Sequence, residues 1–128
     1  MTLKSNIKEL MGVATTFASL EKIDYSDFEE FEQIIATRKD YPRAVIQIGN
    51  LTGQNSDVTL TIHYLDILSD DKSNKLQIHS DFNAFCAYLY NNFNMIYEWS
   101  GEFYNQVLGQ NLAGGAMNLT LKQDNLEC

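Results

Sequence analysis

Apolar and polar residues alternate most regularly from residue 58 onward, and this stretch organises the rest of the chain. The apolar face of the expected strand consists of Val58, Leu60, Ile62 and Tyr64. The polar face consists of Thr59, Thr61 and His63. A period of two, in residues that favour strands, is typical of a half-buried strand. Past Tyr64 the second face also becomes apolar, at Leu65 and Ile67, which predicts cover on both sides at this end.

A helix is expected after this strand. Residues 69–74 form a polar loop, residues 76–78 resume an extended pattern, and Ser80 or Asp81 can then cap a helix. Its apolar residues recur with helical spacing and share one stripe: Phe82, Phe85, Cys86, Leu89 and Phe93. The stripe needs an apolar surface, and the strand that begins at Val58 is the nearest candidate.

The N-terminal residues follow helical spacing from about Thr2 to Ser19, with Gly12 as a weak point. The apolar positions of this expected helix are Leu3, Ile7, Leu10, Met11 and Ala14, joined by Phe17. Residues 20–25 make a shorter segment that is compatible with extended backbone.

Residues 27–37 fit two structures, and the local pattern does not decide between them. Ser26 and Glu29 have the spacing of a capping box. A helix would align Phe28, Phe31 and Ile35 on one face. A strand would instead align Phe31, Gln33 and Ile35. This segment carries four carboxylates, at Asp27, Glu29, Glu30 and Glu32. Their pattern indicates a solvated face with favourable negative charge at a helix start, and not a metal site.

The middle of the chain predicts a hairpin with a long loop. Residues 44–48 alternate as a strand, and the turn-rich residues 49–57 lead into the strand that begins at Val58. A sheet edge or a projecting loop tip is where such a protein would contact a neighbour.

The last third of the chain is first aromatic and then rich in glycine. Ile96–Trp99 is expected to be an aromatic segment, Ser100-Gly101 a turn, and the residues from Phe103 to Leu112 extended or irregular. Ala113–Gly115 is expected to be a flexible break before a final strand at residues 117–121. Together the elements predict a single α+β domain over residues 1–128, with a mainly antiparallel sheet packed against two amphipathic helices.

Composition narrows the function classes. The chain has 128 residues, of which 45% are hydrophobic, and a formal net charge of −8. This charge disfavours a general nucleic-acid binder and an anionic membrane surface, because both need clustered Lys and Arg. No apolar run approaches the roughly 20 residues that span a bilayer. The N-terminus lacks the apolar core of a signal peptide, so synthesis in the cytosol is expected.

Candidate chemistry is sparse. His63 and His79 fall in separate strand-like segments and are expected to be structural residues. Cys86 lies on the apolar stripe, which should raise its pKa and suppress the thiolate. Nothing in the sequence demands a disulfide between Cys86 and Cys128. Zinc-ligand, phosphate-loop and nucleophile-elbow motifs are missing, so no catalytic residue, metal site or cofactor is predicted.

Short signposts are spread along the chain: Tyr25-Ser26-Asp27, Tyr41-Pro42, Val58 to Leu68 with Asp66, Asp70 to Asn74, Leu76 to Asp81, Leu112 to Gly114, Leu119 to Leu121 and Cys128. This combination resembles a group of small virion proteins from tailed bacteriophages of gut Bacteroidetes, including crAss-like phages. The chain departs from that group at Ser26, where the group has glycine, and at Gly115, where an aromatic residue is frequent.

The resemblance implies a structural protein of the phage neck or tail, similar in role to tail-completion, tail-terminator or head–tail connector ring proteins. It implies a homo-oligomeric ring around the DNA channel that contacts other virion proteins (portal, connector and tail). It also implies location in the virion after synthesis in the host cytoplasm, without a membrane partner or an enzymatic activity. An acidic subunit fits such a ring, because a negative lumen lets DNA slide without specific binding.

Interface residues are expected in the loop 47–57, in the acidic segment 24–32 and in the aromatic segment 99–104. The individual candidates are Asp27, Glu29, Glu30, Gln54, Asn55, Asp66, Trp99, Phe103 and Tyr104. Two alternatives stay open. One is a small acidic binding or inhibitor module that meets a basic partner, and the other is a small enzyme that uses Cys86 or His79.

Overall fold

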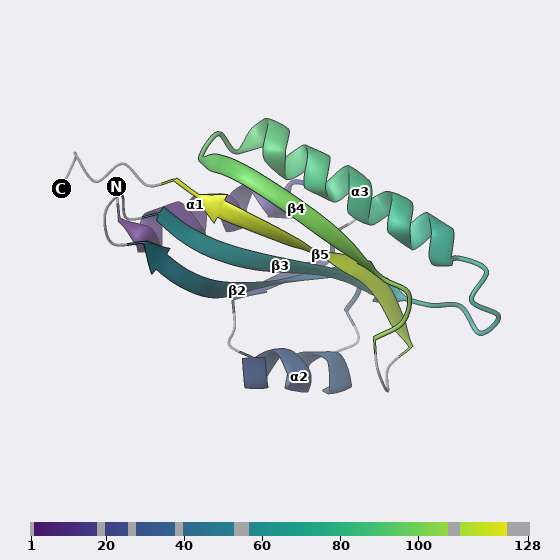
Figure 1. The fold of residues 1–128 in the computed structure, drawn as a ribbon. Helices are drawn as coiled ribbons and strands as arrows, with labels where there is room; N and C mark the ends of the chain where they lie inside the picture. The colour runs from purple at the N-terminus through teal and green to yellow at the C-terminus, as the bar shows by residue number, and fades with distance from the viewer. Residues whose placement is uncertain are drawn as a thin grey trace.

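The computed structural model describes residues 2–17, 20–25, 28–37, 40–52, 57–107 and 111–122 (Figure 1). Its elements in chain order are α1 (Leu3–Thr15), β1 (Lys22–Tyr25), α2 (Phe28–Thr37), β2 (Arg43–Thr52), β3 (Asp57–Ile67), α3 (Lys75–Asn92), β4 (Ile96–Tyr104) and β5 (Leu112–Leu121). The described residues form a five-stranded sheet in the order β1-β2-β3-β5-β4. Within it β1 runs parallel to β2 and the other neighbours are antiparallel. The predicted α+β class and mainly antiparallel sheet are confirmed.

Helices cover the two faces of the sheet unequally: α1 and α3 pack on one face, and α2 lies on the other (Figure 1). The main core lies between the sheet and the α1–α3 layer. There the apolar rows of β3 and α3 meet as their spacing predicts: Val58, Leu60, Ile62, Tyr64, Phe82, Phe85, Cys86, Leu89 and Phe93. Removing this apolar area from water, at about 25 cal/mol per Å², is the dominant stabilising contribution.

Residues 28–37 form the helix α2, which decides between the two structures that the sequence allowed. The Phe31 ring of α2 stacks on the His63 ring of β3, with 4.2 Å between centroids. The second face of β3 is therefore covered near its C-terminal end. Leu65 on this face is fully buried, as predicted, whereas 47% of Ile67 stays exposed.

The helix α1 starts where expected and ends earlier. Its N-cap is Thr2, whose hydroxyl accepts the Ser5 N–H at 3.1 Å, while the Ser5 hydroxyl accepts the Thr2 N–H at 3.0 Å. The helix ends at Thr15, because both the N–H and the hydroxyl of Thr16 donate to the Val13 carbonyl, at 3.1 and 2.6 Å. The predicted end at Ser19 lies outside the described residues.

The helix α3 begins at Lys75, so the extended run predicted at residues 76–78 and the predicted caps Ser80 and Asp81 are wrong. The reason lies in the loop before it. The Asn74 amide accepts the Ser69 N–H at 2.8 Å and donates to the Ile67 carbonyl at 3.0 Å. These two bonds close the loop on the end of β3. Ile78 then packs with two distant apolar residues, Leu68 and Ala113, contacts that local spacing does not show.

The hairpin between β2 and β3 is confirmed, but its loop is shorter than predicted. β2 continues to Thr52 and β3 begins at Asp57, with residues 53–56 outside the described ones. The register shifts between Ile48 and Leu51. In this irregular part the Asn50 N–H donates to the Thr59 hydroxyl at 2.7 Å, so side-chain bonding keeps a turn-like sequence inside the strand.

The turn predicted at Ser100-Gly101 and the break predicted at Ala113–Gly115 are wrong, because both lie within strands. Gly114 has a φ of +152°, and a Cβ there would lie 1.8 Å from a carbonyl oxygen of β3. A Cβ at Gly115 would lie 2.4 Å from the Phe82 ring. These glycines allow β3 and α3 to approach β5 closely, and their role is packing.

Candidate functional site

The strand β4 forms one edge of the sheet, and among the described residues no strand pairs with its outer side. It is nine residues long, which corresponds to about 30 Å of extended backbone. The opposite edge strand, β1, has only four residues. A long edge strand presents a row of N–H and C=O groups that can pair with another chain, so β4 is the first place to look for an interaction site.

Aromatic side chains line the helix-side face of β4. Trp99 pairs with Leu119 of the core and Phe103 pairs with Gly115, so both project to the side of α3. The Phe103 ring meets the Phe82 ring edge-on, with 5.6 Å between centroids. Nevertheless 39% of Trp99 and 56% of Phe103 are exposed. Phe103 is thus held by a contact within the subunit, and both rings are only partly covered.

The helix α3 also fixes the C-terminal end of β4. The His79 Nε2–H donates to the Tyr104 carbonyl at 2.9 Å, and the His79 ring lies 5.0 Å from that of Phe103. His79 was expected in a strand, and it lies in α3. Its hydrogen bond makes it a tie between α3 and the edge strand.

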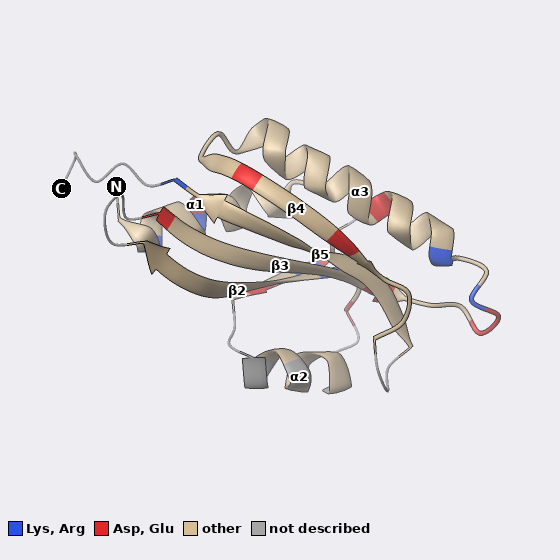
Figure 2. Cartoon of the chain, viewed as in Figure 1, with Lys and Arg blue, Asp and Glu red and all other residues tan. Residues whose placement is uncertain are grey.

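The opposite face of β4 is polar and acidic, because Glu98 and Glu102 alternate with the aromatic residues and are exposed. Figure 2 shows the two acidic positions along β4. Beside them lies a hollow of about 480 Å³ whose polar lining is Thr59, Thr61, Glu98, Ser100, Asn118 and Thr120. The hydroxyl of Thr61 donates to the side-chain carbonyl of Asn118 at 2.9 Å. The edge therefore offers aromatic rings on one side and carboxylates on the other.

At the end of β4, Tyr104 is engaged within the subunit. Its hydroxyl donates to His63 Nδ1 at 2.9 Å, and His63 Nε2–H donates to the Gln47 side-chain oxygen at 2.8 Å. Burial beneath Phe31 lowers the pKa of His63 to about 4. Burial, and then the nearby Glu102 charge, raise the pKa of Tyr104. This chain of hydrogen bonds is that of a neutral structural imidazole.

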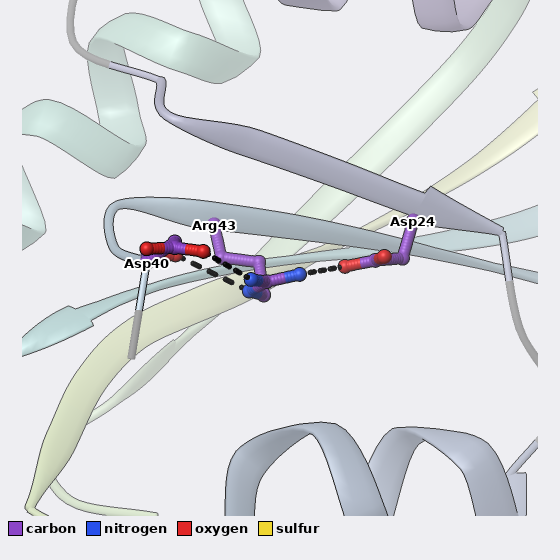
Figure 3. Close-up of polar contacts among 3 residues, drawn as sticks. All are labelled: Asp24, Asp40 and Arg43. Carbon is purple, nitrogen blue, oxygen red and sulfur yellow. Dashed lines mark hydrogen bonds and ion pairs between the residues drawn. The ribbon is translucent and has the colours of Figure 1, made fainter. Parts of the chain in front are cut away.

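A buried arginine ties the other edge strand to the sheet (Figure 3). Arg43 of β2 donates to the Asp24 carboxylate of β1, and its Nε donates to the Asp40 carbonyl at 3.2 Å. The Asp40 carboxylate lies 3.8 Å from Arg43 Nη2. Only 3% of Arg43 is exposed. Its buried guanidinium charge therefore needs the two carboxylates as partners, because an unpaired buried charge is strongly destabilising. Burial raises the pKa of the adjacent Tyr41, whose ring lies under the guanidinium.

The structure places the predicted interface residues unevenly. Asp27, Gln54 and Asn55 lie outside the described residues. Glu29 and Glu30 lie in α2, where their side chains are not among those described.

The other predicted residues can be placed. Asp66 is at the end of β3, where its carboxylate accepts the Ile67 N–H at 2.8 Å and burial raises its pKa. Trp99, Phe103 and Tyr104 come together on β4, and the first two are exposed.

Two further residues of this edge, Glu98 and Glu102, escaped prediction. The signal was present as a period of two across residues 98–104, with polar residues at even positions and Trp99, Gly101 and Phe103 at odd ones. The expectation of a turn at Ser100-Gly101 hid this alternation.

Groups that could act chemically are placed for structural roles. Cys86 is buried in the core, and burial raises the pKa of its thiol to about 12. Within the described ranges, His, Cys, Asp and Glu side chains do not gather in threes that could hold a metal ion. The described helices also include none with the length and apolar character needed to cross a bilayer.

Comparison with known proteins adds no family. No protein-family model matches the chain, and no curated protein is significantly similar to it in sequence.

Proposed function

We propose that this chain is a structural subunit of a tailed-bacteriophage virion that forms a homo-oligomeric ring at the head–tail junction or in the tail. There it joins the capsid portal to the tail around the DNA channel. The observation that carries the assembly part is β4, a long edge strand with exposed aromatic rings. The phage part rests on the sequence signposts, among them Tyr41-Pro42 and the segment from Val58 to Asp81.

Edge strands and exposed aromatic rings favour protein–protein contact for separate reasons. The backbone of β4 can extend its hydrogen bonding into another chain, and soluble proteins usually block such edges by shortening or covering them. Trp and other aromatic residues contribute a large share of the binding energy in interfaces. Phe103 is also held by His79 and Phe82 of α3 before binding, so less conformational entropy is lost on association.

Charge on β4 favours a ring over a two-fold dimer. In a two-fold pairing of two β4 strands with full overlap, the symmetry axis passes at Ser100 and sets each Glu98 opposite Glu102 of the other copy. Like charges directly opposite one another destabilise a sheet. A head-to-tail contact between different surfaces avoids this repulsion and closes into a ring when the rotation between copies allows.

The acidic character of the subunit supports passage of DNA. A formal charge of −8 on each of several copies repels phosphates at short range. A ring of such subunits surrounds the duplex without the counterion release that drives DNA binding.

Mass-resolved size exclusion of the purified chain over a range of concentrations tests the proposal, followed by electron microscopy of the largest species. We expect concentration-dependent oligomers that appear as closed rings. Trp99→Ser combined with Phe103→Ser should abolish them. The matched control is Ile67→Ser, which removes an apolar side chain that is 47% exposed in β3, the middle strand of the sheet.

Two outcomes contradict the proposal. A chain that stays monomeric at every concentration is not a ring subunit. A small acidic binding module would behave in this way and instead form a one-to-one complex with a basic protein. Purified virions of the source phage that lack the chain by mass spectrometry would exclude the neck or tail assignment.

A further inference from the structure

A second apolar surface lies on the other side of the molecule, between α1 and β1. It is a groove of about 370 Å³ lined by Leu3, Lys4, Ile7, Lys8, Met11 and Tyr25. Leu3 is 37% and Tyr25 46% exposed. The floor is apolar, so the groove suits an apolar or aromatic group, and two lysines of α1 stand at its rim.

The groove and the β4 edge are at opposite ends of the sheet. β1 and β4 are the two edge strands, separated by β2, β3 and β5. Tyr25 pairs with Ile46, a residue of the main core, and therefore lies on the face of the sheet that α1 and α3 cover. Trp99 and Phe103 lie on the same side. A second copy placed beside the first in the same orientation would bring its aromatic pair to this groove.

Strand direction is compatible with this arrangement. β1 runs parallel to β2, and from β2 to β4 the strands alternate in direction, so β4 runs opposite to β1. When copies are set side by side, β4 of one is antiparallel to β1 of the next. Antiparallel pairing is the more stable kind of strand contact.

Charges at the two surfaces are complementary. β4 carries Glu98 and Glu102 and no basic residue. The opposite edge carries an exposed Lys22 on β1, which pairs with Arg43 and so lies on the same face of the sheet as Glu98 and Glu102. Lys4 and Lys8 of α1 add positive charge on the other face, beside the groove. The carboxylate of Asp24, the acidic residue of β1, is already paired with Arg43. Opposite charges across an interface steer association and set which partner surfaces meet.

We infer that the α1–β1 groove receives Trp99 and Phe103 of a second copy of this chain, with Glu98 and Glu102 on the other face of the joined sheets, toward Lys22. This contact rests on the proposed ring function and supplies its repeating interface. Each copy uses two different surfaces, so the contact is heterologous and continues from copy to copy. One free aromatic edge and one free groove remain on any open assembly, and both are satisfied when the ring closes.

Mixing two defective variants tests this inference. The edge variant carries Trp99→Ser and Phe103→Ser, and the groove variant carries Leu3→Ser and Tyr25→Ser, which remove the exposed apolar lining. Each variant alone should be monomeric, with at least a tenfold weaker association than the unchanged chain. Mixed together, they retain one intact edge and one intact groove, so they should form a heterodimer of one copy each and nothing larger. Ile67→Ser, at an apolar position of the middle strand β3 that is 47% exposed, is the matched control and should assemble normally.

Carbodiimide cross-linking gives an independent reading. In the assembled chain we expect intermolecular links from Glu98 or Glu102 to Lys22, identified by mass spectrometry of mixed isotope-labelled copies. Circular dichroism and thermal unfolding establish that each variant is folded. If the edge variant fails to fold, Glu98→Lys with Glu102→Lys replaces it and should give the same heterodimer with the groove variant.

The possible outcomes separate this inference from the function on which it rests. If the unchanged chain forms rings and the groove variant forms them equally well, the groove assignment is wrong and the ring function stands. If the unchanged chain stays monomeric at every concentration, both are wrong.

Discussion

At the scale of single residues, two glycines differ in the space that surrounds them. Gly115 lies in β5 beneath the Phe82 ring, where an added Cβ would lie 2.4 Å from a ring carbon and 2.5 Å from the Glu102 carbonyl oxygen. Gly12 lies within α1, and a Cβ added there meets nothing within 4 Å. The same substitution should therefore shift stability in opposite directions at these two positions.

Gly115→Ala should lower the free energy of unfolding by about 1–3 kcal/mol, because the methyl group pushes both the Phe82 ring and the backbone of β4 away from β5. Gly12→Ala should raise it by about 0.5–1 kcal/mol, because alanine loses less backbone entropy in a helix. Urea unfolding followed by circular dichroism measures both. Equal effects of the two substitutions would show that Gly115 is not a packing position.

His63 should make stability depend on pH. Burial lowers its pKa from 6.5 to about 4 in the folded protein, so the unfolded chain binds the proton more tightly and stability rises with pH across this interval. The contribution is complete above pH 6.5 and is lost as the pH falls toward 4, with a magnitude of about 3 kcal/mol. Comparing urea unfolding at pH 7 and pH 5 should give a smaller difference for His63→Gln than for the unchanged chain. An NMR titration of His63 with a midpoint near 6.5 would contradict the assignment.

At the scale of elements, regular apolar spacing predicted helices and strands correctly, whereas polar and glycine-rich segments led to wrong predictions of turns and breaks. The stripe from Phe82 to Phe93 and the alternation after Val58 correctly gave α3, β3 and the core between them. Polar and glycine-rich segments failed, because their structure depends on distant partners. Residues 113–115 read as flexible, yet they are a buried strand whose missing side chains make room for β3 and α3.

The candidate site was predicted in part for the same reason. Trp99 and Phe103 stood out as aromatic residues, whereas Glu98 and Glu102 gain significance only once residues 96–104 are known to be an edge strand. The α1–β1 groove joins residues that are separated along the sequence, such as Leu3 and Tyr25. No pattern within one element could have indicated it.

The start of α3 should depend on one side chain. Asn74 makes two hydrogen bonds that join the loop to the end of β3. Asn74→Ala leaves the Ile67 carbonyl and the Ser69 N–H without these partners and should destabilise the protein by about 1–3 kcal/mol. Amide hydrogen exchange should rise first in residues 75–79. Asn83→Ala, at an exposed position within the same helix, should be neutral or slightly stabilising.

At the scale of the whole molecule, the separation of acidic and basic surfaces predicts how salt acts on assembly. The Debye length falls from about 10 Å at 0.1 M to about 3 Å at 1 M ionic strength. Association between the acidic β4 edge and the lysine-rimmed groove should therefore slow markedly, while dissociation changes less, because buried aromatic contacts hold the formed complex. Stopped-flow light scattering at the two salt concentrations measures both rates. Association that is faster at high salt would contradict charge steering.

The position of β5 has a consequence for synthesis of the protein. β5 lies between β3 and β4, yet it follows both along the chain. A ribosome therefore releases two strands of the central sheet before the strand that separates them, and Phe82 has no glycine platform to rest on until residues 112–121 emerge. Nascent chains carry two open strand edges and an aromatic surface during this interval, which favours aggregation. A stop codon before Leu112 should send the truncated product to inclusion bodies, and slow translation of residues 112–121 should reduce the soluble yield.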